Sequence, residues 1–160
     1  MVNFKSHSGI YTLESIQEVP IPLEQAWEFF SSPKNLQVIT PPEMGFIITS
    51  DIDAKAYAGQ IISYTVGILP GIRTNWVTEI TTVKDQHYFV DEQRYGPYSM
   101  WHHEHFFKAT PEGNTLIRDK ISYKIPLGFL GRIMNGLFIK SQLNHIFSYR
   151  TEKLKEVFPN

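Results

Sequence analysis

The segment Thr115–Ile125, "TLIRDKISYKI", decides the fold because it has the cleanest alternation of apolar and polar residues in the chain. From position 117 onward its odd-numbered residues are apolar or aromatic, and Asp119 is the one exception. Its even-numbered residues include Arg118, Lys120 and Lys124. Successive side chains of a β-strand point to opposite faces, so the pattern predicts a strand with one face in the core and the other in water. Asp119 is then an ionisable residue on the inner face.

The strand predicted just before it, "YSMWHHEHFFKA" at positions 98–109, carries three histidines within four positions. The link "ATPEGN" has the length of a hairpin connection, and a turn centred near Glu112 sets which residues lie opposite one another. A slip by one residue would bury the three cations of the following strand. His103 and His105 therefore face inward, and His102 faces outward. The predicted opposing pairs are His105 with Asp119, His103 with Ile121, and Trp101 with Tyr123.

Two earlier segments extend the same inner face. The strand "YFVDEQRYG", at positions 88–96, does not by itself decide which of its faces is buried. A turn near Pro97 decides it by pairing this strand with the histidine strand, and Phe89 then faces inward. In "IRTNWVTEI", at positions 72–80, Trp76 falls on the face predicted to point inward. The predicted opposing pairs are Asp91 with His103 and Gln93 with Trp101.

These registers place Asp91, His103, His105 and Asp119 in one polar band beside two tryptophans. Burial of an ionisable group is unfavourable unless the group is paired. A core with only a structural role would rarely concentrate four such side chains. The band therefore predicts a wet cavity inside the fold.

The order of elements predicts an α+β fold. A strand at 10–19 is followed by two short helices, "PLEQAWEFFSS" and "SPKNLQVITPP", and then by six further strands. A long amphipathic helix begins near position 127, and we expect its apolar face to pack along its whole length on the sheet. Three glycines, Gly128, Gly131 and Gly136, loosen its first turns. On its outer side we expect solvated Lys140, Arg150, Lys153 and Lys155, with His145 at the surface.

The composition of the chain limits the classes of function that it can have. A chain of 160 residues with 14% aromatic residues predicts a single domain, 1–160, that lines an interior with rings. A formal net charge of −1 predicts no electrostatic attraction to nucleic acid or to an anionic membrane. The absence of cysteine excludes disulfides and cysteine-ligated metals. We found neither an apolar leader nor a membrane-spanning window, so we expect a cytoplasmic protein without membrane insertion.

Four motifs resemble a bacterial ligand-binding branch of the SRPBCC superfamily, which is START/Bet v1-like and polyketide cyclase-like. They are "AWEFFSSPKNLQVITPP" (26–42), "FVDEQRYGPYSMWHHEHFF" (89–107), "RDKISYKIPLG" (118–128) and "IFSYR" (146–150). The resemblance implies a helix-grip fold, in which a curved seven-stranded antiparallel sheet encloses a cavity against the long helix. It also implies binding of lipids, sterols, hormones or polyketides, and in a minority of members cyclase or hydrolase activity.

We therefore expect a lipid-, sterol- or polyketide-like hydrophobic ligand, held by a His/Asp polar anchor in an apolar pocket. No cofactor and no resident metal are expected, and the chain should be a monomer or a weak homodimer. Entry could be gated by Gly128–Gly136 together with Leu69–Gly71. The residues expected to contact the ligand are Trp76, Phe89, Asp91, Gln93, Trp101, His103, His105, Asp119 and Tyr123.

Other interpretations of the polar band stay open at this point. His105 and Asp119 are equally compatible with a purely structural buried pair. A cyclase-, aromatase- or hydrolase-type enzyme would use His103 or His105 as the general base and Tyr123 as the proton donor. The same two histidines could chelate a metal with a carboxylate, although their spacing is a weak signal. A regulator that binds a protein partner would instead expose apolar surface on the long helix.

Overall fold

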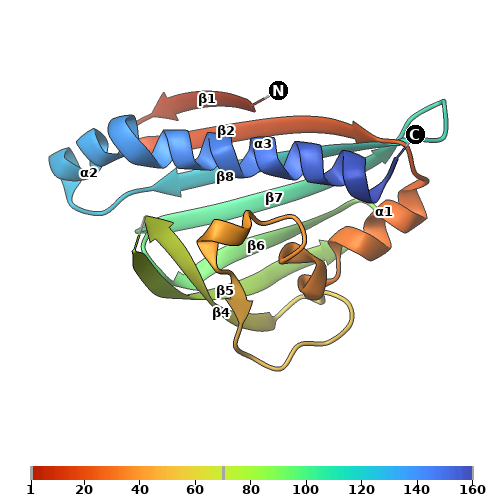
Figure 1. The fold of residues 1–160 in the computed structure, drawn as a ribbon, viewed down its shortest axis with the longest axis horizontal. Coiled ribbons are helices and arrows are strands. Elements are labelled where there is room, and N and C mark those ends of the chain that lie inside the picture. The colour runs from red at the N-terminus through yellow and green to blue at the C-terminus, as the bar shows by residue number, and fades with distance from the viewer. Residues whose placement is uncertain (1, 70, 160) are drawn as a thin grey trace.

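The computed structural model describes residues 2–69 and 71–159, which form one antiparallel sheet with helical segments on one of its faces (Figure 1). The strands are ordered β1-β2-β8-β7-β6-β5-β4-β3 across the sheet. Their bounds are β1 Val2–His7, β2 Ile10–Val19, β3 Ile47–Ile48, β4 Gln60–Leu69, β5 Ile72–Lys84, β6 Tyr88–Tyr95, β7 Met100–Ala109 and β8 Thr115–Lys124. The helical bounds are α1 Leu23–Phe30, η1 Pro33–Leu36, η2 Pro42–Met44, α2 Gly128–Met134, the π-helical turn η3 Asn135–Ile139, and α3 Lys140–Val157.

The sheet has eight strands rather than the expected seven. The additional strand, β1, lies at the edge and pairs with β2 from Val2↔Ser15 to His7↔Ile10. Ser8 and Gly9 both have positive φ, the conformation that a tight hairpin turn requires. The first of the six strands predicted after the short helices, "GFIITSDI" at 45–52, pairs over only two residues, Ile47–Ile48. Among the described residues, no helix is both long and apolar enough to cross a membrane.

The predicted register of β6, β7 and β8 is confirmed. Asp119 lies opposite His105, Ile121 opposite His103, and Tyr123 opposite Trp101. Asp91 lies opposite His103 as predicted, but the β6–β7 ladder ends at Glu92↔His102, so Gln93 and Trp101 do not pair. The side-chain amide of Gln93 instead bonds the backbone N–H and carbonyl of Tyr98 inside the turn.

The C-terminal helix runs without interruption through α2, η3 and α3 across the face of the sheet (Figure 1). Within α3 the buried residues are Leu143, Phe147, Arg150 and Leu154. The expectation that the apolar face packs along the whole helix is wrong for its first half, where Leu130, Leu137 and Phe138 are all at least half exposed. The buried positions there are Gly131 and Asn135.

The buried apolar residues of the described chain form three clusters. Trp27 of α1 packs edge-on against Phe107 of β7 at one end, with ring centroids 5.4 Å apart. Leu13, Ile121 and Tyr123 pack against Leu143 and Phe147 of α3 toward the other end. A third cluster of Phe46, Val66 and Trp76 packs against Met44 of η2 and Tyr64 of β4. The polar band predicted from the sequence lies among these clusters.

Candidate functional site

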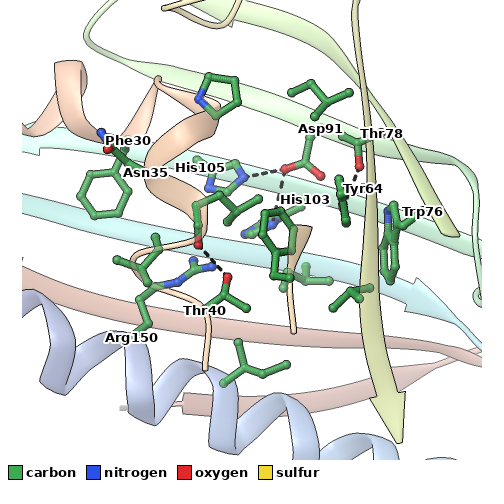
Figure 2. Close-up of a pocket in the computed structure, with 18 of the residues that line it drawn as sticks. Phe30, Asn35, Thr40, Tyr64, Trp76, Thr78, Asp91, His103, His105 and Arg150 are labelled. Carbon is green, nitrogen blue, oxygen red and sulfur yellow. Dashed lines mark hydrogen bonds and ion pairs between the residues drawn. The ribbon is translucent and has the colours of Figure 1, made fainter. Parts of the chain in front are cut away.

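A cavity of about 190 Å³ lies between the sheet, α3 and the segment that holds η1 and η2. Its wall is mostly apolar, with side chains such as Ile62, Phe89, Leu143 and Phe147. A polar group interrupts this wall where Asp91, His103, His105 and Arg150 reach it (Figure 2). Pockets for small molecules usually combine these two features, an apolar wall and a few placed polar groups.

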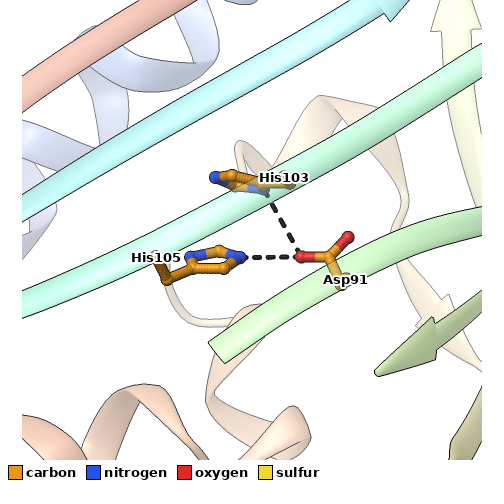
Figure 3. A group of neighbouring side chains, drawn as sticks. All are labelled: Asp91, His103 and His105. Atoms are coloured by element: carbon orange, nitrogen blue, oxygen red, sulfur yellow. Dashed lines mark hydrogen bonds and ion pairs between the residues drawn. The ribbon is translucent and has the colours of Figure 1, made fainter. Parts of the chain in front are cut away.

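His105 lies between two carboxylates. Its Nε2 is 2.7 Å from Oδ2 of Asp91, and its Nδ1 is 3.0 Å from Oδ1 of Asp119. Asp91 comes from β6 and both histidines from β7, so three inward positions on two neighbouring strands converge (Figure 3). Because each ring nitrogen faces a carboxylate oxygen, both must carry a hydrogen to donate. The geometry therefore favours a protonated imidazolium at His105.

His103 is bonded less symmetrically. Its Nε2 is 2.9 Å from Oδ1 of Asp119, whereas its Nδ1 is 3.5 Å from Oδ2 of Asp91. The longer distance requires no N–H at Nδ1, so a neutral ring satisfies the geometry. The ring centroids of His103 and His105 are only 3.6 Å apart, so two positive rings would repel each other.

Arg150 completes the network and corrects an expectation from the sequence. We expected it on the solvated face of the long helix, but it is buried and extends from α3 toward the strands (Figure 2). Its guanidinium lies 3.4 Å from Oδ1 of Asp119 and stacks over Phe147 at 4.7 Å. With Asp91 and Asp119 negative and with Arg150 and His105 positive, the buried charges balance.

The same contacts explain the pKa shifts. Burial alone would raise the pKa of Asp119, but the Arg150 guanidinium and hydrogen bonds from both histidines hold that pKa well below its usual value. Burial opposes a charge on His105, yet hydrogen bonds to Asp119 and Asp91 raise its pKa above that of a free histidine. Burial and the charge of His105 lower the pKa of His103. The two neighbouring rings are thus shifted in opposite directions.

We expect these protonation states to be visible by NMR. At pH 6.5, the reference pKa of histidine, long-range ¹H–¹⁵N spectra should show both nitrogens of His105 protonated and His103 largely neutral with hydrogen on Nε2. Asp91→Asn removes one carboxylate and should lower the pKa of His105, because a charge-assisted bond is lost. Two neutral rings, or a charge on His103 in place of His105, would contradict the assignment.

The structure brings six of the nine expected ligand residues to the cavity wall and leaves three away from it. Asp119 lies behind the histidines, where it bonds both rings and Arg150. Gln93 closes the β6–β7 turn, as described above. The Tyr123 hydroxyl donates to Oδ1 of Asn135 at 2.9 Å, so the proton donor suggested for an enzyme does not face the cavity. The six residues in the wall are Trp76, Phe89, Asp91, Trp101, His103 and His105.

Other wall residues were not anticipated. The Tyr64 hydroxyl lies 3.0 Å from Oγ1 of Thr78, and both residues line the cavity. A buried polar atom without a hydrogen-bond partner occurs in three of the described wall residues, at Nε1 of Trp76, Nε of Arg150 and Oγ of Ser31. The alternation of β4 could have suggested Tyr64, whereas nothing in the sequence around Arg150 distinguishes it from a surface arginine.

The outward residues also have partners. His102 lies 2.8 Å from a carboxylate oxygen of Glu92, on the face opposite the cavity. His145 is exposed as expected and pairs at 2.6 Å with Glu43, so it links α3 to η2. The expected gate at Gly128–Gly136 contributes no residue to the cavity wall. Its second part, Leu69–Gly71, includes Pro70 and the side chain of Leu69, which lie outside the described residues.

Within the described part of the chain, Asp91, His103 and His105 form a group that could hold a metal ion. Each offers one ligand atom, and these atoms lie within 4.8 Å of one another. Metal binding requires a deprotonated ring nitrogen directed at the ion. Here Nε2 of His105 already donates to Asp91, so a metal would have to displace this proton and break a charge-balanced network.

Comparisons with known proteins identify the fold. No protein-family model matches the chain, and no curated protein matches it. A START superfamily protein from Mycobacterium smegmatis has a TM-score of 0.67 and 13% identity, covering 91% of this chain and 98% of that one. A norcoclaurine synthase mutant from Thalictrum flavum has a TM-score of 0.65 and 16% identity, covering 95% and 98%. Ara h 8.0201 has a TM-score of 0.57 and 13% identity, covering 92% and 99%. The chain has the helix-grip fold of START and Bet v1-like proteins.

Proposed function

We propose that the cavity binds a small, largely apolar molecule that carries one neutral hydrogen-bonding group such as a hydroxyl. The observation that carries this proposal is the charge balance inside the wall. Two carboxylates lie within ion-pair distance of one guanidinium and of His105, and with His105 protonated these four charges neutralise one another. An ionised ligand group would add an uncompensated buried charge, which is strongly unfavourable.

The polar atoms of the wall suit a hydroxyl group in particular. Asp91 offers a carboxylate acceptor, and the indole N–H of Trp76 is a buried donor without a partner. A ligand hydroxyl can donate to the Asp91 carboxylate and can at the same time accept a hydrogen bond from a donor of the wall. A ligand group that only accepts hydrogen bonds would give the Asp91 carboxylate no donor. A purely apolar ligand would leave both the carboxylate and the indole N–H without a hydrogen bond from the ligand.

The size of the cavity supports a compact ligand. A volume of about 190 Å³ greatly exceeds the room that one water needs. It is smaller than the roughly 300–1,000 Å³ of pockets for drug-sized molecules. Among the lipid-, sterol- and polyketide-like classes we therefore favour small ring-containing members. The norcoclaurine synthase neighbour is described in complex with a transition-state analogue, so the fold is compatible with holding a small molecule.

A matched pair of ligands tests the proposal. We expect 2-naphthol, a neutral two-ring molecule with one hydroxyl, to bind at least tenfold more tightly than the anion 2-naphthoate in calorimetric titrations. Asp91→Asn should weaken 2-naphthol binding by roughly tenfold or more, because a hydrogen bond to a charged group is lost. Shifts of the Trp76 and Trp101 indole signals in NMR spectra would place the ligand in the cavity.

Glu92→Gln is the control for this experiment. Glu92 is the next residue on β6, but its carboxylate faces outward and pairs with His102 and Arg94. We expect this variant to bind 2-naphthol like the unmodified protein. Equal binding of the two ligands, or equal affinity of the Asp91 variant and the unmodified protein, would exclude the proposed anchor.

A further inference from the structure

The first half of the C-terminal helix exposes a large apolar surface. Six large side chains, five in this half and one at the N-cap residue before it, are between 43% and 70% exposed. Solvent-exposed apolar patches of this kind usually mark an interaction site. We call this surface the α2 patch, and it consists of Leu127, Phe129, Leu130, Ile133, Leu137 and Phe138. Figure 1 shows α2 at one end of the molecule, beyond the end of β8.

The helix orientation that exposes the patch is fixed by its opposite side. Phe129, Ile133 and Leu137 follow one another at four-residue spacing and therefore share one side of the helix. Gly131 and Asn135 have the same spacing on the buried side. The large apolar residues thus face solvent while a glycine and an asparagine face the protein, which reverses the usual amphipathic arrangement.

Two contacts hold this reversed arrangement. A Cβ at Gly131 would overlap the carbonyl oxygen of Pro126, so only glycine permits the close approach of the helix to the preceding loop. Asn135 accepts a hydrogen bond from the buried Tyr123 hydroxyl at 2.9 Å. Rotation of the helix to bury the patch would drive larger side chains into the first contact and break the second.

The stretch of chain that carries the patch has positive charges and no negative ones. Between Asp119 and Glu152 the chain has no acidic residue, whereas it has five basic ones. Among the described residues, the exposed Lys124, Arg132 and Lys140 make no ion pair. The other ten of the 15 basic residues share the rest of the chain with all 16 acidic residues. The overall charge of −1 therefore conceals a basic end.

We propose that the α2 patch docks on the surface of a membrane that contains anionic phospholipids. Leucine and phenylalanine side chains would enter the interface between headgroups and acyl chains, while the three unpaired cations contact lipid phosphates. A second copy of the chain fits this surface less well, because an isologous contact would bring the same cations together. The proposal goes beyond ligand binding and does not depend on it.

Vesicle sedimentation with the full chain tests the docking. We expect binding to vesicles of equal parts phosphatidylglycerol and phosphatidylcholine, and binding at least tenfold weaker to phosphatidylcholine alone. Removal of charge by Lys124→Gln or Arg132→Gln should weaken binding by about fivefold for each residue. The double variant Phe129→Asn/Leu137→Asn should abolish binding, and its circular dichroism should match the unmodified protein because both side chains are exposed.

Matched controls lie elsewhere on the molecule. Ile47→Asn/Ile61→Asn removes two side chains of similar exposure from β3 and β4, at the opposite edge of the sheet. Lys84→Gln/Lys108→Gln removes two exposed charges away from α2. Both controls should bind vesicles normally. Failure of the unmodified protein to bind anionic vesicles, or an equal loss in the controls, would overturn the proposal. So would a dimer in sedimentation equilibrium that Phe129→Asn/Leu137→Asn dissociates, because a second copy would then cover the patch.

Discussion

Replacement of Asp119 by asparagine is expected to lower the free energy of unfolding by about 3–5 kcal/mol, the usual effect of breaking a buried ion pair. Asp119 accepts from Nε2 of His103 and Nδ1 of His105, and its charge faces the Arg150 guanidinium. Asparagine keeps the shape but leaves the buried guanidinium without an anion at this position. Urea unfolding followed by tryptophan fluorescence measures the change.

Two further variants test whether the loss of stability comes from leaving a buried charge unpaired. Asp119→Asn/Arg150→Met removes both charges, so it should be more stable than the sum of the single effects predicts. Glu14→Gln is the control, because it removes a partially exposed carboxylate of β2 that pairs with Arg118 of β8. It should change the free energy of unfolding by less than about 1 kcal/mol. Additive effects in the double variant would show that Asp119 and Arg150 do not stabilise each other.

Replacement of Gly131 by alanine is expected to lower the free energy of unfolding by about 1–3 kcal/mol, as overpacking of a tight contact does. The added methyl group would overlap the Pro126 carbonyl oxygen and crowd Ile125. Relief of this overlap has to move α2 away from the loop, which also strains the bond between Tyr123 and Asn135. Thermal and urea unfolding both report the loss.

Gly136→Ala provides the matched control in the same helical run. A Cβ at Gly136 meets no atom within 4 Å, and this glycine is absent from the positive-φ residues. Alanine is favoured over glycine in a helix, so this variant should be more stable by up to about 1 kcal/mol. The two substitutions are chemically identical and should act with opposite signs. The same sign at both positions would mean that the approach of the helix to Pro126 is not tight.

Much of the site could be predicted from the sequence because strand alternation is rigid. The alternation of apolar residues and cations in β8 set which of its residues face inward, Asp119 included. The hairpin link then set the inward positions of β7, and the next turn set those of β6. The inner positions of Asp91, His103 and His105 followed without knowledge of the fold. The prediction failed for Gln93, where the chain turns before the ladder reaches it.

The helix was harder to predict because its buried side is set by contacts rather than by pattern. Arg150 lies among other basic residues of the helix and resembles a surface residue, yet its guanidinium reaches the buried carboxylate of Asp119 on β8. Hydrophobicity likewise suggested that Leu137 is buried. The tight approach at Gly131 and the hydrogen bond at Asn135 decide otherwise, and both depend on residues that are distant from the helix pattern.

Strand β1 was missed for a different reason. Its six residues alternate weakly and its side chains are mostly exposed, so the hydrophobic pattern carries little information. The signal that could have identified it is the turn at Ser8 and Gly9, which joins two runs of strand length. The helix-grip architecture itself was predictable, since element order and local motifs agree with it.

The two attachments of the C-terminal helix have a kinetic consequence. Asn135 ties the helix to β8 near its start, and Arg150 ties it there again farther along. The segment over the other side of the cavity, which includes Met44 of η2, reaches α3 through the exposed pair of Glu43 and His145. Separation of that segment from α3 breaks a solvent-screened ion pair, whereas movement of the helix away from β8 breaks buried contacts. We therefore expect the residence time of a bound molecule to be set by how often η2 lifts, and not by the helix.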